Sequence, residues 1–291
     1  MAAKPRITIV GAGNLGRALG LSLRKAGYRV EAVVARAKGG SLTRARRLAN
    51  ELGARAVTLT QLTIEAEVVW LCVPDAQIAG AAESLAGARR WNGQVVFHSS
   101  GPLTSDELGA LRRRGAVVAS IHPLMTFVRK SRPSLEGISF AIEGDPRAVR
   151  VARRIVQDLG GTIHAIPKRD KAAYHAWGTF ASPLLTAFLA TTEQVAAGAG
   201  VSGKSGKEAR KRMLPILQQT LSNYMKLGAA DSFSGPIVRG DVEIVKRHLR
   251  VLREIPAAME VYLALAKAAL RYLPAKNRRL LQDVLNQQHR A

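Results

Sequence analysis

The sequence has little cysteine and no long uninterrupted apolar segment. One cysteine, Cys72, stands among 291 residues, so no intramolecular disulfide can form, and its place in the apolar run 68–73 indicates a small buried side chain. No run of about 18 apolar residues is free of charge, glycine and proline, so we predict no membrane span. Residues 1–5 lead directly into a predicted strand, so we expect no signal peptide. These features together favour a cytoplasmic protein.

Acidic residues are also scarce: 21 Asp and Glu stand against 44 Lys and Arg, which gives a net charge of +23 at pH 7. Such an excess is typical of proteins that bind nucleic acid or another anion. The basic residues are nevertheless spread over short groups at 44–47, 89–90, 112–114, 207–212 and 278–279. No basic segment alternates with aromatic residues, which make up 5% of the chain. We therefore do not expect nucleic acid as the main ligand, and the sequence does not explain the high charge.

The composition, with 47% hydrophobic and 22% charged residues, is that of a globular protein long enough for two domains. In residues 1–167 strand-like and helix-like segments alternate, which predicts an α/β fold, a doubly wound Rossmann domain with a parallel sheet. After Pro167 apolar residues recur at helical spacing, which predicts an all-α C-terminal domain over 168–291. The predicted strands are 6–10, 29–35, 68–73, 95–98, 117–121, 139–142 and 162–166. The predicted helices are 17–26, 41–52, 76–85, 104–114, 146–159, 168–197 with a kink at Pro183, 208–226, 242–253, 257–273 and 275–288.

Residues 11–16 read GAGNLG, a GxGxxG motif that directly follows the first predicted strand and opens the first helix. Gly11 permits the tight turn, Gly13 leaves room for a pyrophosphate, and Gly16 allows the helix and strand to pack closely. The diphosphate would then meet the free N–H groups at the positive end of the helix. In this context the motif predicts a dinucleotide site.

The end of the second strand indicates which dinucleotide is bound. An acidic residue there would bind the ribose 2′-hydroxyl of NAD, but the position holds Arg36, followed by Lys38, Ser41 and Arg44. Glu31 lies too early in the strand to serve. Cations match a 2′-phosphate through charge-assisted hydrogen bonds, so the sequence favours NADP(H). Chance placement is the competing explanation in a chain so rich in arginine.

Two further strand ends should border the nicotinamide, since ligands of open α/β sheets bind outside the carboxyl ends of the strands. They are Val73-Pro74-Asp75 and His98-Ser99-Ser100-Gly101, of which Asp75 can equally cap the next helix. We expect no metal site. The candidate cofactor-binding residues are therefore Gly11, Gly13, Asn14, Leu15, Gly16, Arg36, Val73, Pro74 and Ser99.

Five segments follow one another along nearly the whole chain: 73–75 (VPD), 98–101 (HSSG), 122–127 (HPLMTF), 170–176 (DKAAYHA) and 235–241 (GPIVRGD). Together they resemble a family within the 6-phosphogluconate dehydrogenase superfamily that pairs a Rossmann domain with a helical C-terminal domain of unknown function. Relatives in that superfamily include pyrroline-5-carboxylate reductase, deazaflavin-dependent NADP reductase and an alternative type of ketopantoate reductase. The motifs are specific for the family but not for a substrate.

The resemblance also implies catalytic residues. In that superfamily the first long helix after the Rossmann domain carries a lysine, often with an asparagine, that faces the nicotinamide. Lys171 holds the corresponding position and so resembles the proton donor to a carbonyl being reduced. His175 lies one turn further along, so both side chains project from the same helix face. Without the resemblance, Lys171 is interpreted as a solvated lysine and His175 as a core histidine.

The candidate substrate-binding residues are His122, Ser182 and Arg239. His122 follows a strand and should reach the same cleft, or else forms part of a structural turn. Arg239 suits a substrate carboxylate and Asp241 would orient it, although the pair can also simply close a loop. Family members commonly have asparagine after the Ala-Ser pair of the long helix, where this chain has Pro183, so substrate identity does not carry over directly.

These features predict an NADP(H)-dependent oxidoreductase that reduces a C=O or C=N bond of a small carboxylate, and the resemblance makes ketopantoate one candidate. A non-catalytic NADP-binding sensor or scaffold is the alternative, motivated by Pro183. Apolar residues on several faces of helices such as 261–273 favour a homodimer through the helical domain, which the resemblance also implies.

Overall fold

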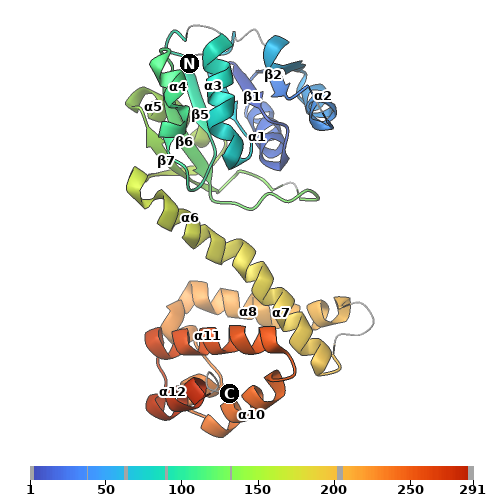
Figure 1. Ribbon diagram of the computed structural model, residues 1–291, viewed down its shortest axis with the longest axis vertical. Helices are drawn as coiled ribbons and strands as arrows, with labels where there is room; N and C mark the ends of the chain where they lie inside the picture. The colour runs from blue at the N-terminus through green and yellow to red at the C-terminus, as the bar shows by residue number, and fades with distance from the viewer. Residues whose placement is uncertain are drawn as a thin grey trace. The chain divides into compact units, whose positions relative to one another are not determined.

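The computed structural model describes residues 3–37, 39–61, 65–88, 91–131, 133–201 and 206–287. It divides into two compact units, Met1–Thr179 and Phe180–Ala291. The first unit is a Rossmann-type sheet with helices on both faces, and the second is helical (Figure 1). The predicted fold class is thereby confirmed. Among the described residues, no helix is both long and apolar enough to cross a membrane.

The first unit contains eight strands in one sheet, ordered β3-β2-β1-β4-β5-β6-β7-β8. Neighbouring strands are parallel except for β6 and β7, which are antiparallel. The strands are β1 (Ile7–Val10), β2 (Val30–Ala35), β3 (Arg55–Thr58), β4 (Val68–Leu71), β5 (Val95–His98), β6 (Val117–Pro123), β7 (Ser139–Gly144) and β8 (Thr162–Ala165). The helices are α1 (Asn14–Lys25), α2 (Ser41–Leu52), α3 (Ile78–Ala88), α4 (Gly109–Arg113), α5 (Pro146–Asp158) and α6 (Lys171–Thr179).

Two features of the sheet differ from the sequence prediction. The edge strand β3 was not predicted, because Arg55 is exposed and only Thr58 of its four residues is buried, which leaves no apolar run to identify it. The β6–β7 pair is antiparallel because the residues described between the two strands form no helix, and a parallel pair needs such a crossover.

Apolar side chains cover both faces of the sheet. On one face α1, α2 and α5 pack around a core that includes Leu19, Leu48 and Ile155. On the other face α3 packs around Ile78 and Leu85. Because both faces are covered, the central strands β1, β4 and β5 are buried along their whole length, and only the strand ends remain for ligands.

The predicted helix over 168–197 is found as α6, a π-helical turn at Phe180–Leu184 that contains Pro183, and α7 (Leu185–Gly198). Proline lacks the N–H that the helix ladder needs, which explains the irregular turn. The compact units divide after Thr179 rather than after residue 167, because Lys171 and Tyr174 of α6 are buried against the first unit.

The second unit is built from α7, α8 (Lys207–Ser232), α9 (Pro236–Arg239), α10 (Val242–Leu252), α11 (Pro256–Tyr272) and α12 (Arg278–Gln287). Its core joins α10, α11 and α12 through residues such as Val245, Leu263 and Leu281. No residue of α7 is buried, and Ala209 is the buried residue of α8. These two helices, with the π-helical turn before α7, leave many large apolar side chains exposed. They are Leu184 in the turn, Leu185 in α7, and Leu214, Ile216, Leu221, Tyr224, Met225 and Leu227 in α8.

Candidate functional site

The GxGxxG turn has the geometry that its glycines predict. Gly11 has φ +107°, and a Cβ atom there would lie 2.5 Å from the carbonyl oxygen of Cys72. A Cβ at Gly16 would lie 2.1 Å from the carbonyl oxygen of Gly11. A Cβ at Gly13, in contrast, would meet no atom within 4 Å, so this side of the turn is open. Gly13 precedes α1 and no side chain caps the helix, so its first N–H groups can bind an anion.

A cavity of about 550 Å³ lies beside this turn, at the carboxyl ends of β1, β2 and β4; we call it the carboxyl-edge cavity. Arg36, Ser41 and Arg44 line its β2 side, and none of its described lining residues is acidic. Lys38 lies outside the described residues. The lining residues are Val10, Gly11, Ala12, Gly13, Val34, Ala35, Arg36, Ser41, Arg44, Leu59, Cys72, Val73, Pro74, Ala76, Gln77, Gly80, Ala81 and Ser84. The predicted residues Gly11, Gly13, Arg36, Val73 and Pro74 therefore meet at one cavity.

The other predicted cofactor residues lie elsewhere around the turn. Asn14 lines a neighbouring cavity of about 940 Å³, which Arg44 also lines, and its side-chain amide donates a hydrogen bond to the carbonyl oxygen of Phe127 at 3.0 Å. The Leu15 side chain packs against the core of the sheet. The Ser99 hydroxyl accepts a hydrogen bond from the Trp70 indole at 2.8 Å. Leu15 and Ser99 line neither cavity, so any contact that they make with the cofactor would use their backbone groups.

Lys171 is fully buried at the start of α6. Its amine donates hydrogen bonds to the Ser120 hydroxyl at 2.7 Å and to the Ser100 carbonyl oxygen at 3.3 Å. Burial lowers the pKa of Lys171 to about 8, while the negative charges of Glu143 and Asp75 act in the opposite direction. The amine thus joins the end of β5 to β6 and has no surface in contact with solvent.

Two buried side chains of this cluster were not predicted from the sequence. Glu143 on β7 accepts hydrogen bonds from the Ser105 amide at 2.6 Å and the Ser105 hydroxyl at 2.8 Å. Ser120 lies on β6 and is also buried. Each is a polar residue next to apolar residues in a largely buried strand, and that pattern was the available signal, because a buried polar group needs a partner.

His98, at the end of β5, is held as a neutral imidazole. Its Nδ1 accepts a hydrogen bond from the Ser100 amide at 3.1 Å, so Nε2 carries the proton and donates to the Thr104 carbonyl oxygen at 2.9 Å. Burial lowers the pKa of His98 to about 4. The ring therefore fixes the 98–104 loop that carries Ser100.

The predicted residues His122 and His175 lie together at Gly101. Their ring centroids are 6.2 Å apart, and a Cβ atom at Gly101 would lie 2.3 Å from Cδ2 of His175 and 3.2 Å from Nε2 of His122. His122 shares a hydrogen bond of 3.0 Å with the Tyr174 hydroxyl, and its pKa is lowered to about 4 by burial and then by the charge of Lys171. His175 is the exposed member of the group. The structure thus brings Lys171, His175 and His122 to the carboxyl ends of β5 and β6.

Arg239 and Ser182 belong to the helical unit. Arg239 ends α9, and its Nε donates a hydrogen bond to Asp241 at 2.8 Å, as the sequence indicated for this pair. The Arg239 side chain is 61% exposed, which leaves its terminal nitrogens open to solvent. Ser182 lies in the π-helical turn and its carbonyl oxygen accepts a hydrogen bond from Thr186.

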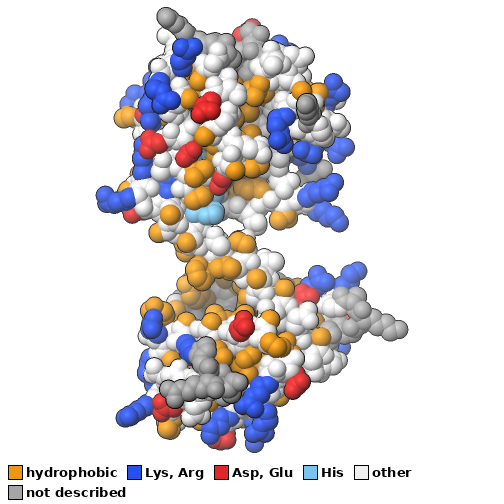
Figure 2. All heavy atoms as spheres, viewed as in Figure 1, with side chains coloured by type: hydrophobic (Ala, Val, Ile, Leu, Met, Phe, Trp, Pro, Cys, Tyr) orange, Lys and Arg blue, Asp and Glu red, His pale blue; other side chains and the backbone are white. Residues whose placement is uncertain are grey.

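Basic side chains are scattered over the face shown in Figure 2 instead of forming one patch. Over the described ranges of the chain, no three His, Cys, Asp or Glu side chains group closely enough to hold a metal ion.

Two family models match parts of the chain, and the second match crosses the boundary between the two compact units. Residues 1–123 match the family model of a Rossmann-like domain, and residues 138–269 match that of a domain of unknown function, DUF2520. None of the curated proteins searched matches the sequence.

Solved structures share the fold along nearly the whole chain. A candidate NADP oxidoreductase from Bacteroides fragilis is 20% identical, with a TM-score of 0.76 over 91% of this chain and 97% of its own. A protein from Thermotoga maritima is 25% identical, with a TM-score of 0.67 over 97% and 99%. A reductive aminase from Aspergillus terreus, solved with NADPH and ethyl-5-oxohexanoate, is 17% identical, with a TM-score of 0.67 over 96% and 99%. The chain therefore shares its fold with these proteins, and it resembles a Rossmann-like domain over residues 1–123 and DUF2520 over residues 138–269.

Proposed function

We propose that this protein is an NADP(H)-dependent oxidoreductase that reduces a C=O or C=N bond of a small carboxylate. The carboxyl-edge cavity carries the proposal, because it combines an open glycine turn, an uncapped helix start and the cations Arg36 and Arg44, without a described acidic residue in its lining. The fold shared with the reductive aminase and the candidate NADP oxidoreductase supports the same class of cofactor. When bound, the nicotinamide supplies the hydride.

The fit of the cavity to NADP(H) rests on charge and shape. Gly13 leaves the space that a pyrophosphate requires, and the N–H groups at the start of α1 are free to bind it. Arg36 and Arg44 offer two guanidinium groups to the 2′-phosphate of NADPH. NADH lacks this phosphate.

Titration of NADPH and NADH, followed by nicotinamide fluorescence, tests this cofactor choice. We expect Arg36→Ala and Arg44→Ala each to weaken NADPH binding by about tenfold or more, the loss typical of a charge-assisted hydrogen bond, and to leave NADH binding unchanged. Arg46→Ala is the matched control, since Arg46 is exposed on the same helix and lines neither cavity. Equal binding of both cofactors by all variants would contradict NADP selectivity, and binding of neither would contradict the proposed function.

Reduction of C=O or C=N also requires a proton. His175 is exposed beside Gly101, whereas Lys171 has no exposed surface. We therefore assign proton donation to His175 and a positioning role to Lys171, whose amine holds Ser100 and Ser120 and so fixes the loop that carries Gly101. His175→Asn should lower kcat at least about a hundredfold while the dissociation constant of NADPH stays within twofold.

Arg239 is the proposed carboxylate-binding residue, because Asp241 fixes its Nε and its terminal N–H groups face solvent. His122 and Ser182 are proposed to contact the substrate as well. Oxidation of NADPH with 2-keto acids and with cyclic imines that carry a carboxylate tests the substrate class, ketopantoate among them. Arg239→Gln should raise KM with little change in kcat for the carboxylate substrate, and an unchanged KM would contradict this role.

The helical unit is proposed to form a homodimer. Its helices α7 and α8 expose the apolar side chains named above, and an unpaired apolar surface of this kind is typical of a subunit interface. A second copy of the chain is the partner we expect. Sedimentation at micromolar concentration should give about twice the chain mass of 31.3 kDa, and Ile216→Lys together with Met225→Lys should give the monomer. A monomeric wild type would contradict this proposal.

The sensor alternative predicts tight NADPH binding without turnover of any keto acid or imine. It differs from the reductase in one measurement, hydride transfer from bound NADPH. Full activity of His175→Asn with a true substrate would instead leave the reductase in place and remove only the proton assignment.

A further inference from the structure

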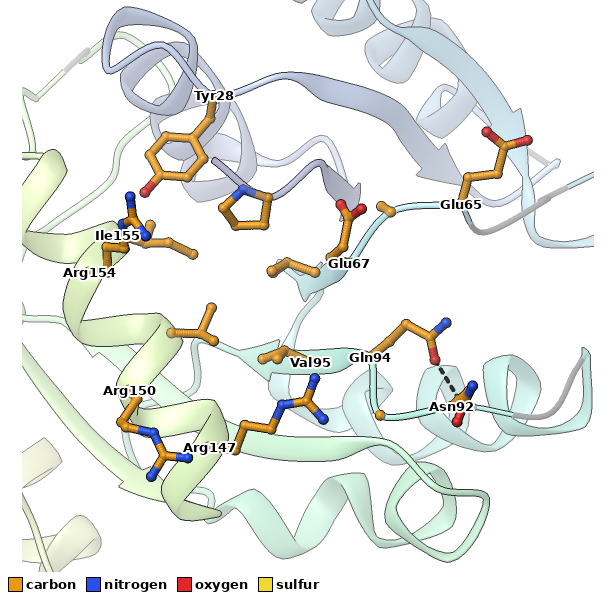
Figure 3. Close-up of a pocket in the computed structure, with 15 residues that line it drawn as sticks. Tyr28, Glu65, Glu67, Asn92, Gln94, Val95, Arg147, Arg150, Arg154 and Ile155 are labelled. Carbon is orange, nitrogen blue, oxygen red and sulfur yellow. Dashed lines mark hydrogen bonds between the residues drawn. The ribbon is translucent and has the colours of Figure 1, made fainter. Parts of the chain in front are cut away.

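A second cavity, of about 550 Å³, lies at the amino ends of β1, β4 and β5, the opposite edge of the sheet from the glycine turn. We call it the amino-edge cavity. Glu67 and Gln94 directly precede β4 and β5, Pro5 lies two residues before β1, and α5 supplies the facing wall (Figure 3). Because the proposed cofactor and substrate sites use the carboxyl edge, no part of the proposed reaction accounts for this cavity.

The wall on α5 is basic. Arg147, Arg150 and Arg154 follow one another at intervals of three and four residues, so they share one side of the helix, while Ala148, Ala152 and Ile155 bury the other side in the sheet. Figure 3 shows the Arg147 guanidinium reaching from α5 toward Gln94 and Val95, and the Arg154 guanidinium beside Tyr28.

The acidic residues at this edge are already paired. Glu67 lies 2.9 Å from Arg6, and Glu65 lies 3.9 Å from the same guanidinium. Asp158 accepts a hydrogen bond from the Tyr28 hydroxyl at 2.7 Å and lies 3.1 Å from Lys4. Over the ranges that the structure describes, Arg147 and Arg150 have neither an ion pair nor a hydrogen bond, so two positive charges at the cavity are left without a partner.

The remaining lining supplies donors and an apolar floor. The Gln94 side-chain oxygen accepts a hydrogen bond from the backbone N–H of Asn92 at 2.6 Å. The NH₂ group of Gln94 is therefore the donor that a ligand can use. Next to it, Gly93 has no side chain, and a Cβ there would lie 2.7 Å from Nη1 of Arg147. The glycine thus makes room for the guanidinium. The floor is apolar and consists of Val68, Val95, Val151 and Ile155.

We propose that the amino-edge cavity binds a phosphate monoester of a small molecule, with the phosphate on Arg147, Arg150 and the Gln94 amide and the apolar part against the valine and isoleucine floor. Two unpaired guanidinium groups match a dianion, and their planar N–H pairs suit phosphate oxygens. The volume exceeds that of a phosphate ion, which argues for an organic group attached to it.

Phenyl phosphate is a suitable probe because it joins a dianion to an apolar ring. Isothermal titration at low salt should show saturable binding to the wild-type protein, and the double variant Arg147→Gln/Arg150→Gln should weaken it at least about tenfold, the effect of losing a charge-assisted hydrogen bond. Arg153→Gln is the matched control, because Arg153 is exposed on the same helix and does not line the cavity. This control should not change the dissociation constant.

Three results would overturn the proposal. They are no saturable binding by the wild type, equal weakening by Arg153→Gln, and benzoate binding as tightly as phenyl phosphate, which would remove the preference for a dianion. Displacement of phenyl phosphate by a short RNA at lower concentration would likewise replace a small-molecule site with a nucleic-acid surface. All these variants change exposed side chains, and circular dichroism at 25 °C should show the wild-type fold for each.

Discussion

The amine of Lys171 donates a hydrogen bond to the hydroxyl of Ser120 over 2.7 Å, and neither side chain has any exposed surface. A cation is therefore held inside the first unit, at the point where β5 and β6 end. After burial, the positive charge of Lys171 also lowers the pKa values of His98 and His122. The stability and the chemistry of this edge of the sheet thus depend on the same amine.

The first prediction concerns the pH dependence that Lys171 gives to folding. Its pKa is about 8 in the folded protein and near its ordinary value of 10.5 in the unfolded chain. Between these values the unfolded chain binds more protons, so this residue makes the free energy of unfolding rise with pH, by at most about 1.4 kcal/mol per pH unit. Urea titrations from pH 7.5 to 10 should show that Lys171→Met loses this rise, whereas Lys25→Met, at an exposed lysine, keeps it. Parallel curves for the two variants would contradict the low pKa.

A second prediction concerns His98 and His122, which stay neutral in the folded protein down to about pH 4. The unfolded chain takes up protons below about 6.5, so these two groups make stability fall as the pH drops from 6.5 toward 4. NMR spectra of the histidine ring protons should show both rings keeping their neutral chemical shifts at pH 5. A titration midpoint near 6.5 for either ring would show that it is not buried as described.

The third prediction uses Gly101, where a Cβ atom would lie 2.3 Å from the His175 ring. Gly101→Ala should displace that ring and lower kcat by about a hundredfold, the cost of a misplaced catalytic group, without changing NADPH binding. Gly87→Ala is the control, because a Cβ on that helical glycine meets no atom within 4 Å. It should retain full activity and gain up to about 1 kcal/mol of stability. Wild-type kcat in Gly101→Ala would separate His175 from catalysis.

The fourth prediction tests the buried carboxylate of Glu143, which accepts two hydrogen bonds from Ser105. Glu143→Gln replaces one acceptor oxygen by an NH₂ donor, so one of these bonds is lost, and the free energy of unfolding should fall by about 1.5–3 kcal/mol. It also removes the charge that raises the pKa of Lys171, so the rise of stability with pH should begin at lower pH. Glu83→Gln, at an exposed glutamate of α3, should change stability by less than about 0.5 kcal/mol.

The glycine turn could be predicted from sequence because its constraints are local. Gly11 and Gly16 lie close to each other, and Gly11 lies close to the backbone of Cys72 at the end of β4, and a short motif is enough to specify the turn itself. The alternation of strands and helices likewise predicted the sheet, since each buried strand is a short apolar run.

The buried cluster could not be assembled in the same way. Lys171, Ser120 and Glu143 lie on three different elements, and they meet because of the order of the strands and the reversal at β7, neither of which the local pattern contains. The sequence placed Lys171 on the correct helix, but its burial depends on how α6 packs against β5 and β6. Arg147 and Arg150 are ordinary solvated residues in the sequence, and the cavity beside them forms only when α5 lies across the strand starts.

The close approach of Gly11 to Cys72 gives the protein an internal reporter of local unfolding. Burial raises the pKa of the Cys72 thiol to about 12, so at neutral pH the reactive thiolate is almost absent while the turn is closed. Because the sequence has no second cysteine, alkylation by a thiol reagent reports on this thiol alone, and its rate should rise when β4 and the glycine turn separate. A ligand held in the carboxyl-edge cavity, which Cys72 lines, should slow that reaction, so the alkylation rate of this one thiol also measures occupancy of the cavity.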